Sequence, residues 1–155
     1  SLVGSEMCIR DRNVVDVDGA TGYIDTNFDG KAKAAINEFE NGQDFVYIHV
    51  EAPDECGHRH EIENKSKSIG LIDKYILGPV TDYLSKTGER FKVLVTPDHA
   101  TPLSLKTHTN DPVPFFIYDS EKVCDGVEHF NERTAKSTGY FIDKGYTLME
   151  EFIDK

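Results

Sequence analysis

An apolar run at residues 45–50, followed by Pro53, constrains the fold more than any other stretch of the chain. The run is rich in β-branched and aromatic residues and is nearly continuous, which is typical of a strand covered by helices on both faces. Pro53 cannot donate to a sheet ladder, so the strand should end before it. Asp54 and His58 are then expected in the loop after this strand, where open α/β sheets place their ligand sites. The sequence therefore predicts an α/β fold with a mostly parallel sheet flanked by helices.

Two further apolar runs carry polar residues of the same kinds nearby. Residues 91–96 lead into Asp98 and His99, and His108 precedes the run at residues 113–118. Each of these side chains alone has an ordinary structural interpretation, as a helix cap or a hydrogen-bonded histidine. Together they indicate a divalent-metal site, because imidazole and carboxylate groups suit Zn or Mn, whereas an all-oxygen set would favour Mg or Ca. The candidate ligands are Asp54, His58, Asp98, His99 and His108.

Apolar residues at helical spacing predict helices over residues 29–41, 61–84 and 147–153. The long one should kink or break at Gly78-Pro79, because proline removes a hydrogen bond and clashes with the preceding turn. A short strand is expected at residues 13–17. The side chains expected to face the core from these helices are Ala32, Ala35, Ile36, Phe39, Ile62, Ile69, Ile72, Ile76, Val80, Tyr83, Leu148, Met149, Phe152 and Ile153.

Three motifs, in this order, resemble the cofactor-independent phosphoglycerate mutases and in particular their archaeal-type branch. They are APDECGH at residues 52–58, TPDHATP at residues 96–102 and THTNDPVPF at residues 107–115. The runs at residues 19–27 and 135–139 are also similar to that branch. The branch belongs to the alkaline-phosphatase superfamily of two-metal enzymes, so the resemblance implies an alkaline-phosphatase-like core.

The same resemblance implies two divalent metal ions, with Mn or Zn expected first and Mg or Co as alternatives. Asp54, His58 and His108 match the ligands of one ion, and Asp98 and His99 match ligands of the other. In this family a serine takes up the substrate phosphoryl group as phosphoserine. It then returns the group to the other hydroxyl of glycerate, which interconverts 3-phosphoglycerate and 2-phosphoglycerate.

No serine of this chain matches the position of the family's nucleophile, so we expect no catalytic residue here. In the family, that serine, the remaining aspartate of the second metal site and an inserted substrate domain come from the amino-terminal part. We therefore expect residues 13–155 to be the C-terminal part of the metal-binding phosphatase-like domain, inactive alone. Residues 1–12 do not resemble the family and are expected to be a non-native or disordered leader.

Charge and cysteine content limit the partners and the compartment. The net charge of −11 disfavours nucleic acid and anionic membranes as partners, since both would repel an acidic surface. It also favours bound cations if the substrate is a phosphate ester. Three widely spaced cysteines argue against a disulfide framework. With no apolar segment long enough to span a bilayer, the cytoplasm is the expected location.

Several alternatives remain open at this stage. The chain could belong to a phosphatase, phosphodiesterase or sulfatase of the same superfamily, or be a non-catalytic metal-binding or interaction module. Cys56 could be a soft ligand, although a small residue that fills a tight loop is the preferred interpretation. His60 could replace His58 as a ligand, although the motif favours His58. His49 is expected to be a hydrogen-bonded core residue, and His129 suggests no role.

Overall fold

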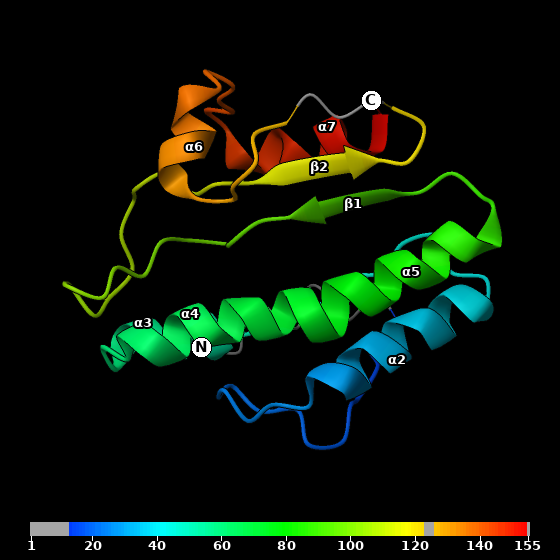
Figure 1. Cartoon of the computed structure of the whole chain (residues 1–155), viewed down its shortest axis with the longest axis horizontal. Coiled ribbons are helices and arrows are strands. Elements are labelled where there is room, and N and C mark those ends of the chain that lie inside the picture. The colour runs from blue at the N-terminus through cyan, green and yellow to red at the C-terminus, as the bar shows by residue number, and fades with distance from the viewer. Residues whose placement is uncertain (1–12, 123–125, 155) are drawn as a thin grey trace. The chain divides into compact units, whose positions relative to one another are not determined.

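The computed structural model describes residues 13–122 and 126–154, and the chain divides into two compact units. The first contains residues 13–56 and 62–80, and the second contains residues 57–61, 81–122 and 126–154. Helices make up most of the regular structure (Figure 1). The leader expected at residues 1–12 lies outside the described residues.

The helix predicted at residues 29–41 is confirmed as α2, Phe28–Glu40. Its start is fixed by Asn27, whose side-chain Oδ1 accepts a hydrogen bond from the Gly30 N–H at 2.8 Å. This bond satisfies one of the N–H groups that the first turn of a helix leaves without a partner. Ala32 and Ala35 are buried, as the periodicity predicted.

The long helix predicted at residues 61–84 is present as one continuous helix that carries the labels α4 and α5 in Figure 1. It consists of α4, η1 and α5, which follow one another directly. Their bounds are Ile62–Ile72 for α4, Asp73–Leu77 for the π-helical η1, and Gly78–Thr87 for α5. The helix was expected to kink or break at Gly78-Pro79, but it continues through this point and only changes from π-helical to α-helical there. The Gly78 N–H donates to the Asp73 carbonyl, five residues back. This wider turn suits Pro79, which has no N–H and would crowd the carbonyl four residues before it.

A small hydrophobic core holds the first unit together. Phe28 of α2, Ala52 and Ile76 of η1 are buried in it. Partly buried neighbours that pack against these three residues are Ile48, Val50, Leu71, Ile72 and Tyr75. Because α2 contacts η1, the core forms at that level of the long helix. Ile62 and Ile69 were expected to be buried and are instead exposed, at 59% and 49%.

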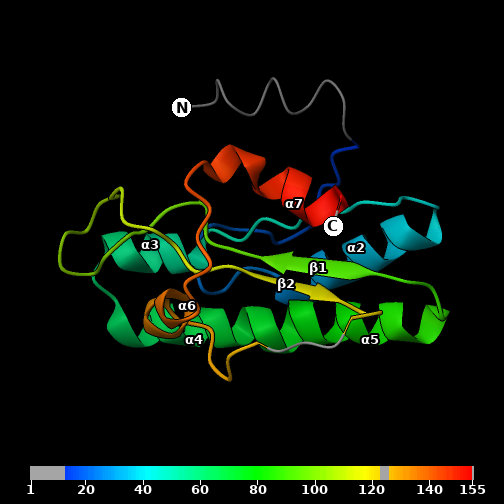
Figure 2. The ribbon, with the colours of Figure 1, turned by 90° about the horizontal axis from the view of Figure 1, so that it is seen from above.

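The sheet is smaller than predicted and has the opposite sense. It consists of β1, Lys92–Val95, and β2, Phe116–Asp119, which pair antiparallel with Lys92 opposite Asp119 (Figure 2). The expectation of a mostly parallel sheet is therefore wrong for the described residues. A parallel return needs a crossover that is usually helical, whereas residues 96–115 connect these strands without a helix.

The strands predicted at residues 13–17 and 45–50 are absent from the part of the chain that the structure describes. An apolar run indicates burial but does not specify a hydrogen-bonded neighbour, and a strand requires one. Burial of the second run is also one-sided. Val50 packs on the core, while Phe45 and Tyr47 are 47% and 66% exposed.

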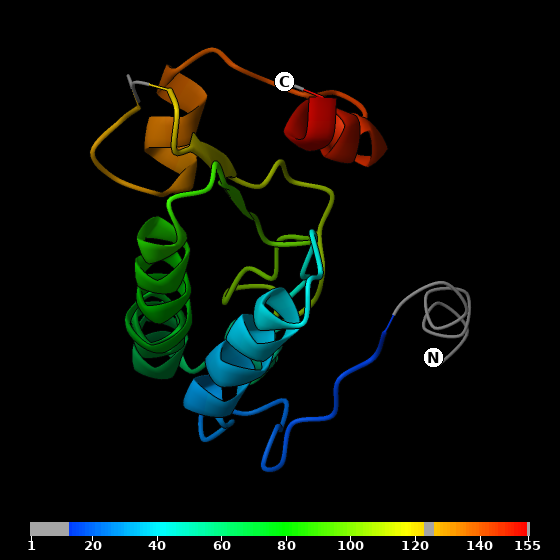
Figure 3. The same cartoon turned by 90° about the vertical axis from the view of Figure 1, so that its right-hand side faces the viewer.

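After β2 the chain forms two short helices in the second unit, α6 and α7 (Figure 3). Their bounds are Glu132–Ser137 and Leu148–Asp154, and the 3-10 turn η2, Gly145–Thr147, precedes α7. The terminal helix was predicted, but Met149 and Ile153 are exposed and not buried. No helix among the described residues is long and apolar enough to cross a membrane.

Candidate metal centre

The segment that carries Asp54 and His58 is a helix, α3, Ala52–His58, and not the loop that the sequence predicted. Pro53 stands in its first turn, where a missing N–H costs nothing, and Asp54 adds a negative charge near the positive end of the helix. These are helix-start signals. The apolar run before Pro53 instead favoured a strand followed by a loop. Because helical residues four apart lie on one face, α3 places the Asp54 carboxylate beside the His58 imidazole.

His58 is held by a backbone carbonyl from the loop that follows β1. Its Nδ1 lies 2.9 Å from the Lys106 carbonyl oxygen. A carbonyl only accepts, so Nδ1 carries the proton, and in the neutral ring Nε2 is then the unprotonated nitrogen. This fixes both the tautomer and the orientation of the ring, as backbone carbonyls commonly do for metal-ligating histidines.

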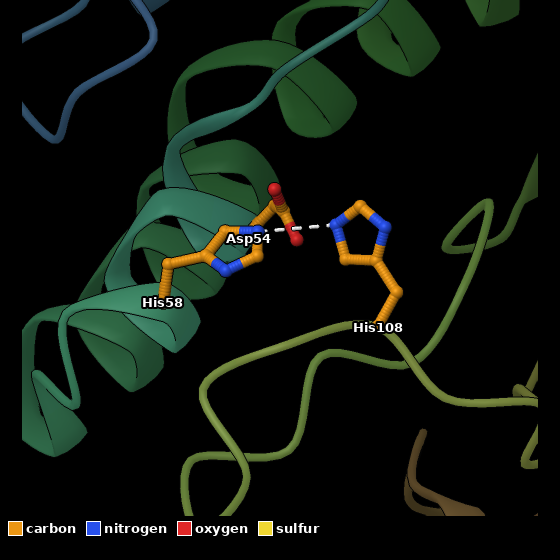
Figure 4. Close-up of side chains that lie close together, drawn as sticks. All are labelled: Asp54, His58 and His108. Atoms are coloured by element: carbon orange, nitrogen blue, oxygen red, sulfur yellow. Dashed lines mark hydrogen bonds between the residues drawn. The ribbon is translucent and has the colours of Figure 1, made fainter.

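His108 approaches the same nitrogen of His58. The two Nε2 atoms lie 3.1 Å apart (Figure 4). When both rings are neutral, His108 must be the donor of this hydrogen bond, because Nε2 of His58 is the acceptor. A cation could replace the shared proton between the two nitrogens.

Asp54, His58 and His108 form a three-residue group capable of holding a metal ion (Figure 4). One ligand atom from each residue lies within 4.8 Å of the other two. Ligand atoms about 2.1 Å from one ion lie within about 4.2 Å of one another, so the observed spread fits with small side-chain movements. One carboxylate and two imidazoles are a donor set suited to Zn or Mn.

The other two candidate ligands are adjacent but do not complete a group of three among the described residues. The Asp98 carboxylate accepts the backbone N–H of His99 at 3.0 Å, and its other oxygen lies 3.3 Å from His99 Nε2. The His99 ring lies against His108, with centroids 3.6 Å apart. A second ion held by Asp98 and His99 therefore stays a prediction.

The remaining histidines and Cys56 are not members of the group. Cys56 is fully buried within α3, which agrees with a space-filling role. His49 was expected to be a hydrogen-bonded core residue. It is exposed, its ring stacks near Tyr47, and its carbonyl accepts the Lys31 ammonium. His60 binds a loop carbonyl, and sequence reasoning gave no sign of that contact.

A helix that presents an acid and an imidazole, a loop that adds a second imidazole, and a donor set for a divalent ion together describe a metal centre. The chain belongs to the metalloenzyme superfamily, whose model matches residues 2–153.

More specifically, the chain is similar to curated phosphoglycerate mutases. It is 46% identical over 144 residues to a probable 2,3-bisphosphoglycerate-independent phosphoglycerate mutase of Geobacter sulfurreducens. It is also 48% identical over 138 residues to the 2,3-bisphosphoglycerate-independent enzyme of Methanosarcina mazei. These matches cover 92% and 88% of this chain, and 36% and 34% of the relatives. The chain thus spans about a third of the length of these relatives.

A solved structure supports the same relationship. The PH0037 protein from Pyrococcus horikoshii superposes with a TM-score of 0.76 at 28% sequence identity. The match covers 92% of this chain and 42% of that one. The fold is therefore a partial match to a superfamily fold, with the strand content described above.

Proposed function

We propose that this chain is the C-terminal, metal-binding part of a cofactor-independent phosphoglycerate mutase of the archaeal type. The complete enzyme would interconvert 3-phosphoglycerate and 2-phosphoglycerate through a phosphoserine, with two divalent ions at its centre. The observation that carries the proposal is the convergence of Asp54, His58 and His108 in a chain that matches known mutases. The superfamily match alone would leave other phosphate or sulfate chemistry open.

In this proposal the three residues have distinct tasks. His58 presents Nε2 because its Nδ1 is bound to the Lys106 carbonyl, and His108 presents its Nε2 from the facing loop. Asp54 adds the negative charge that favours a cation over a proton at this position. Divalent ions bound here would stabilise the charge that develops on the transferring phosphoryl group.

The net charge of the chain supports a role for bound cations. With a net charge of −11 the surface repels a phosphorylated substrate. Bound cations reverse the local field and allow a phosphate ester to approach. A phosphate site with bound metal therefore fits this composition better than a metal-free one.

A titration with Mn(II) and with Zn(II), followed by calorimetry, tests the metal site. The wild-type chain should bind one ion tightly, and Asp54→Ala and His108→Ala should each lose that binding. His129→Ala is the matched control, since His129 is exposed and outside the group, and should bind as the wild type does. A weaker second event is expected from Asp98 and His99. A folded wild-type chain that binds neither metal would contradict the proposal.

An activity assay tests the division between this chain and the rest of the enzyme. We expect the isolated chain, loaded with Mn(II), to convert no 3-phosphoglycerate above a metal blank, because no serine matches the family's nucleophile. Conversion of 3-phosphoglycerate to 2-phosphoglycerate by this chain would show that the nucleophile has been assigned wrongly. Hydrolysis of phosphate esters without that conversion would favour a phosphatase.

A further inference from the structure

Two imidazoles at the end of α3 bind backbone carbonyls of the same loop, which connects β1 to β2. His58 Nδ1 lies 2.9 Å from the Lys106 oxygen, and His60 Nδ1 lies 2.6 Å from the Leu103 oxygen. Both partners are carbonyls, so both Nδ1 atoms act as donors. All of these groups belong to the second unit. His60 therefore joins the end of α3 to the loop that carries His108.

The backbone at this contact is held in an uncommon conformation. His60 has φ 58° and Lys106 has φ 55°, and no other non-glycine residue in the described ranges has a positive φ. This left-handed conformation costs roughly 1–2 kcal/mol for a residue with a Cβ. Such residues persist where surrounding contacts hold them, and they concentrate at functional sites. Both of these lie where the histidine side chains meet the loop.

Backbone hydrogen bonds within the loop restrain part of it. Leu105 and Lys106 donate to the Pro102 carbonyl at 3.1 and 3.0 Å, and Thr109 donates to the Ala100 carbonyl at 3.0 Å. Leu105 is 59% exposed, so its side chain adds little packing. The bond from His60 to the Leu103 carbonyl, at 2.6 Å, is shorter than the two contacts that His58 makes with this loop, at 2.9 and 3.1 Å.

We infer that His60 is a positioning residue for the metal centre: its Nδ1–H holds the loop so that His108 faces His58. The inference rests on the proposed metal-binding function, which it deepens. His60 lies outside the ligand group and acts on the ion through the loop. Replacing a group that hydrogen-bonds a metal ligand directly typically lowers metal affinity 10- to 100-fold. His60 acts one step further from the ion, so we expect the lower end of this range.

Two substitutions at His60 separate the effect of losing the hydrogen bond from the effect of straining the backbone. Glycine and asparagine both tolerate a positive φ, so neither adds strain. The asparagine amide nitrogen occupies nearly the same place as Nδ1 of histidine and can donate to the Leu103 carbonyl, whereas glycine cannot. His60→Gly should bind Mn(II) about tenfold more weakly than the wild type. His60→Asn should restore the affinity to within about twofold of the wild type.

Amide hydrogen exchange of the metal-free chain provides a readout that does not depend on the ion. The Leu105, Lys106 and Thr109 amides should exchange faster in His60→Gly, and His60→Asn should return them to wild-type rates. Unchanged exchange in His60→Gly, or equal Mn(II) affinity in His60→Gly and the wild type, would overturn the inference. The inference would also be overturned if His60→Asn matched His60→Gly in both amide exchange and Mn(II) affinity. A wild type that binds no Mn(II) would instead refute the proposed function, and exchange would still decide the role of His60.

Discussion

Asp119 is buried in the second unit and keeps its charge because Arg90 pairs with both of its oxygens. The Arg90 Nη2 and Nε atoms lie 2.7 and 3.2 Å from Asp119 Oδ2 and Oδ1. The hydrogen bond from Arg90 is the main reason why the pKa of the Asp119 carboxyl lies well below its usual range. The Glu121 N–H and the charge of Lys122 add to the effect. The same hydrogen bond raises the pKa of Arg90.

The lowered pKa makes this ion pair a source of acid sensitivity. An aspartate with a depressed folded-state pKa stabilises the native state above its unfolded pKa of about 3.9, and that stability is lost as the pH falls further. Asp119→Asn should lower the melting temperature at pH 7 by roughly 2–4 °C. The difference between variant and wild type should shrink as the pH falls below about 4.

Thermal denaturation across a pH series measures this difference. Glu121→Gln is the control, because Glu121 also contacts Arg90, at 3.3 Å, but its side chain is 63% exposed. Exposed pairs contribute little, so this variant should melt close to the wild type at every pH. A gap for Asp119→Asn that stayed constant down to pH 2 would contradict the assigned pKa shift.

At this scale the sequence was most informative about residue identity. Acid and imidazole side chains near apolar runs pointed to five candidate ligands, and the structure brings three of them, Asp54, His58 and His108, together in one group. The contact made by His60 was not predictable, since a bond from a side chain to a distant carbonyl leaves no pattern in sequence. The role of Asp54, His58 and His108 as metal ligands stays a prediction.

At the scale of the elements, replacing two helical glycines by alanine is predicted to change the stability of the chain in opposite directions. Alanine favours a helix interior over glycine by about 1 kcal/mol. At Gly30 a new Cβ would lie 2.8 Å from Val17 Cγ1 and 2.3 Å from the Asn27 amide nitrogen. Asn27 cannot easily move, because its side chain also donates to the Asp18 carbonyl at 2.8 Å. At Gly70 nothing lies within 4 Å of the new Cβ.

Gly30→Ala should therefore destabilise the chain by about 1 kcal/mol or more, because the clash displaces the cap of α2 and outweighs helix propensity. Gly70→Ala should stabilise it by about 0.5–1 kcal/mol. Urea unfolding of both variants beside the wild type measures the two values. A stabilising Gly30→Ala would show that Asn27 is not needed as the cap.

Helices were predicted better than strands, for a physical reason. The period and end signals of α2 and of the long helix are local, so the sequence located both helices to within a few residues of their observed bounds. Strand pairing depends on a distant neighbour. The antiparallel partner of β1 and the absence of a ladder at residues 45–50 were therefore not predictable. The start of α3 carried local helix-start signals, Pro53 and Asp54, but the apolar run before them favoured a strand followed by a loop.

At the scale of the whole chain, hydrophobic burial is limited. Among the described residues seven hydrophobic residues are buried, whereas sixteen large ones are exposed. A small core leaves little margin above the entropy cost of folding. A ligand that binds only the native state then has a large relative effect, about 2.7 kcal/mol when its concentration is 100 times its Kd.

The three ligands lie on α3 and on the loop after β1, and none lies on α2, so this stabilisation should be uneven along the chain. Mn(II) should slow amide exchange at residues 54–61 and 100–109, where the three ligands and the loop of His108 lie, and leave α2, which carries no ligand, unchanged. A chelator should reverse the effect, and His108→Ala should abolish it. Exchange measured by mass spectrometry, with and without Mn(II), resolves these segments. Equal protection of α2 would mean that the units unfold together, since local opening would then not be separable from global unfolding.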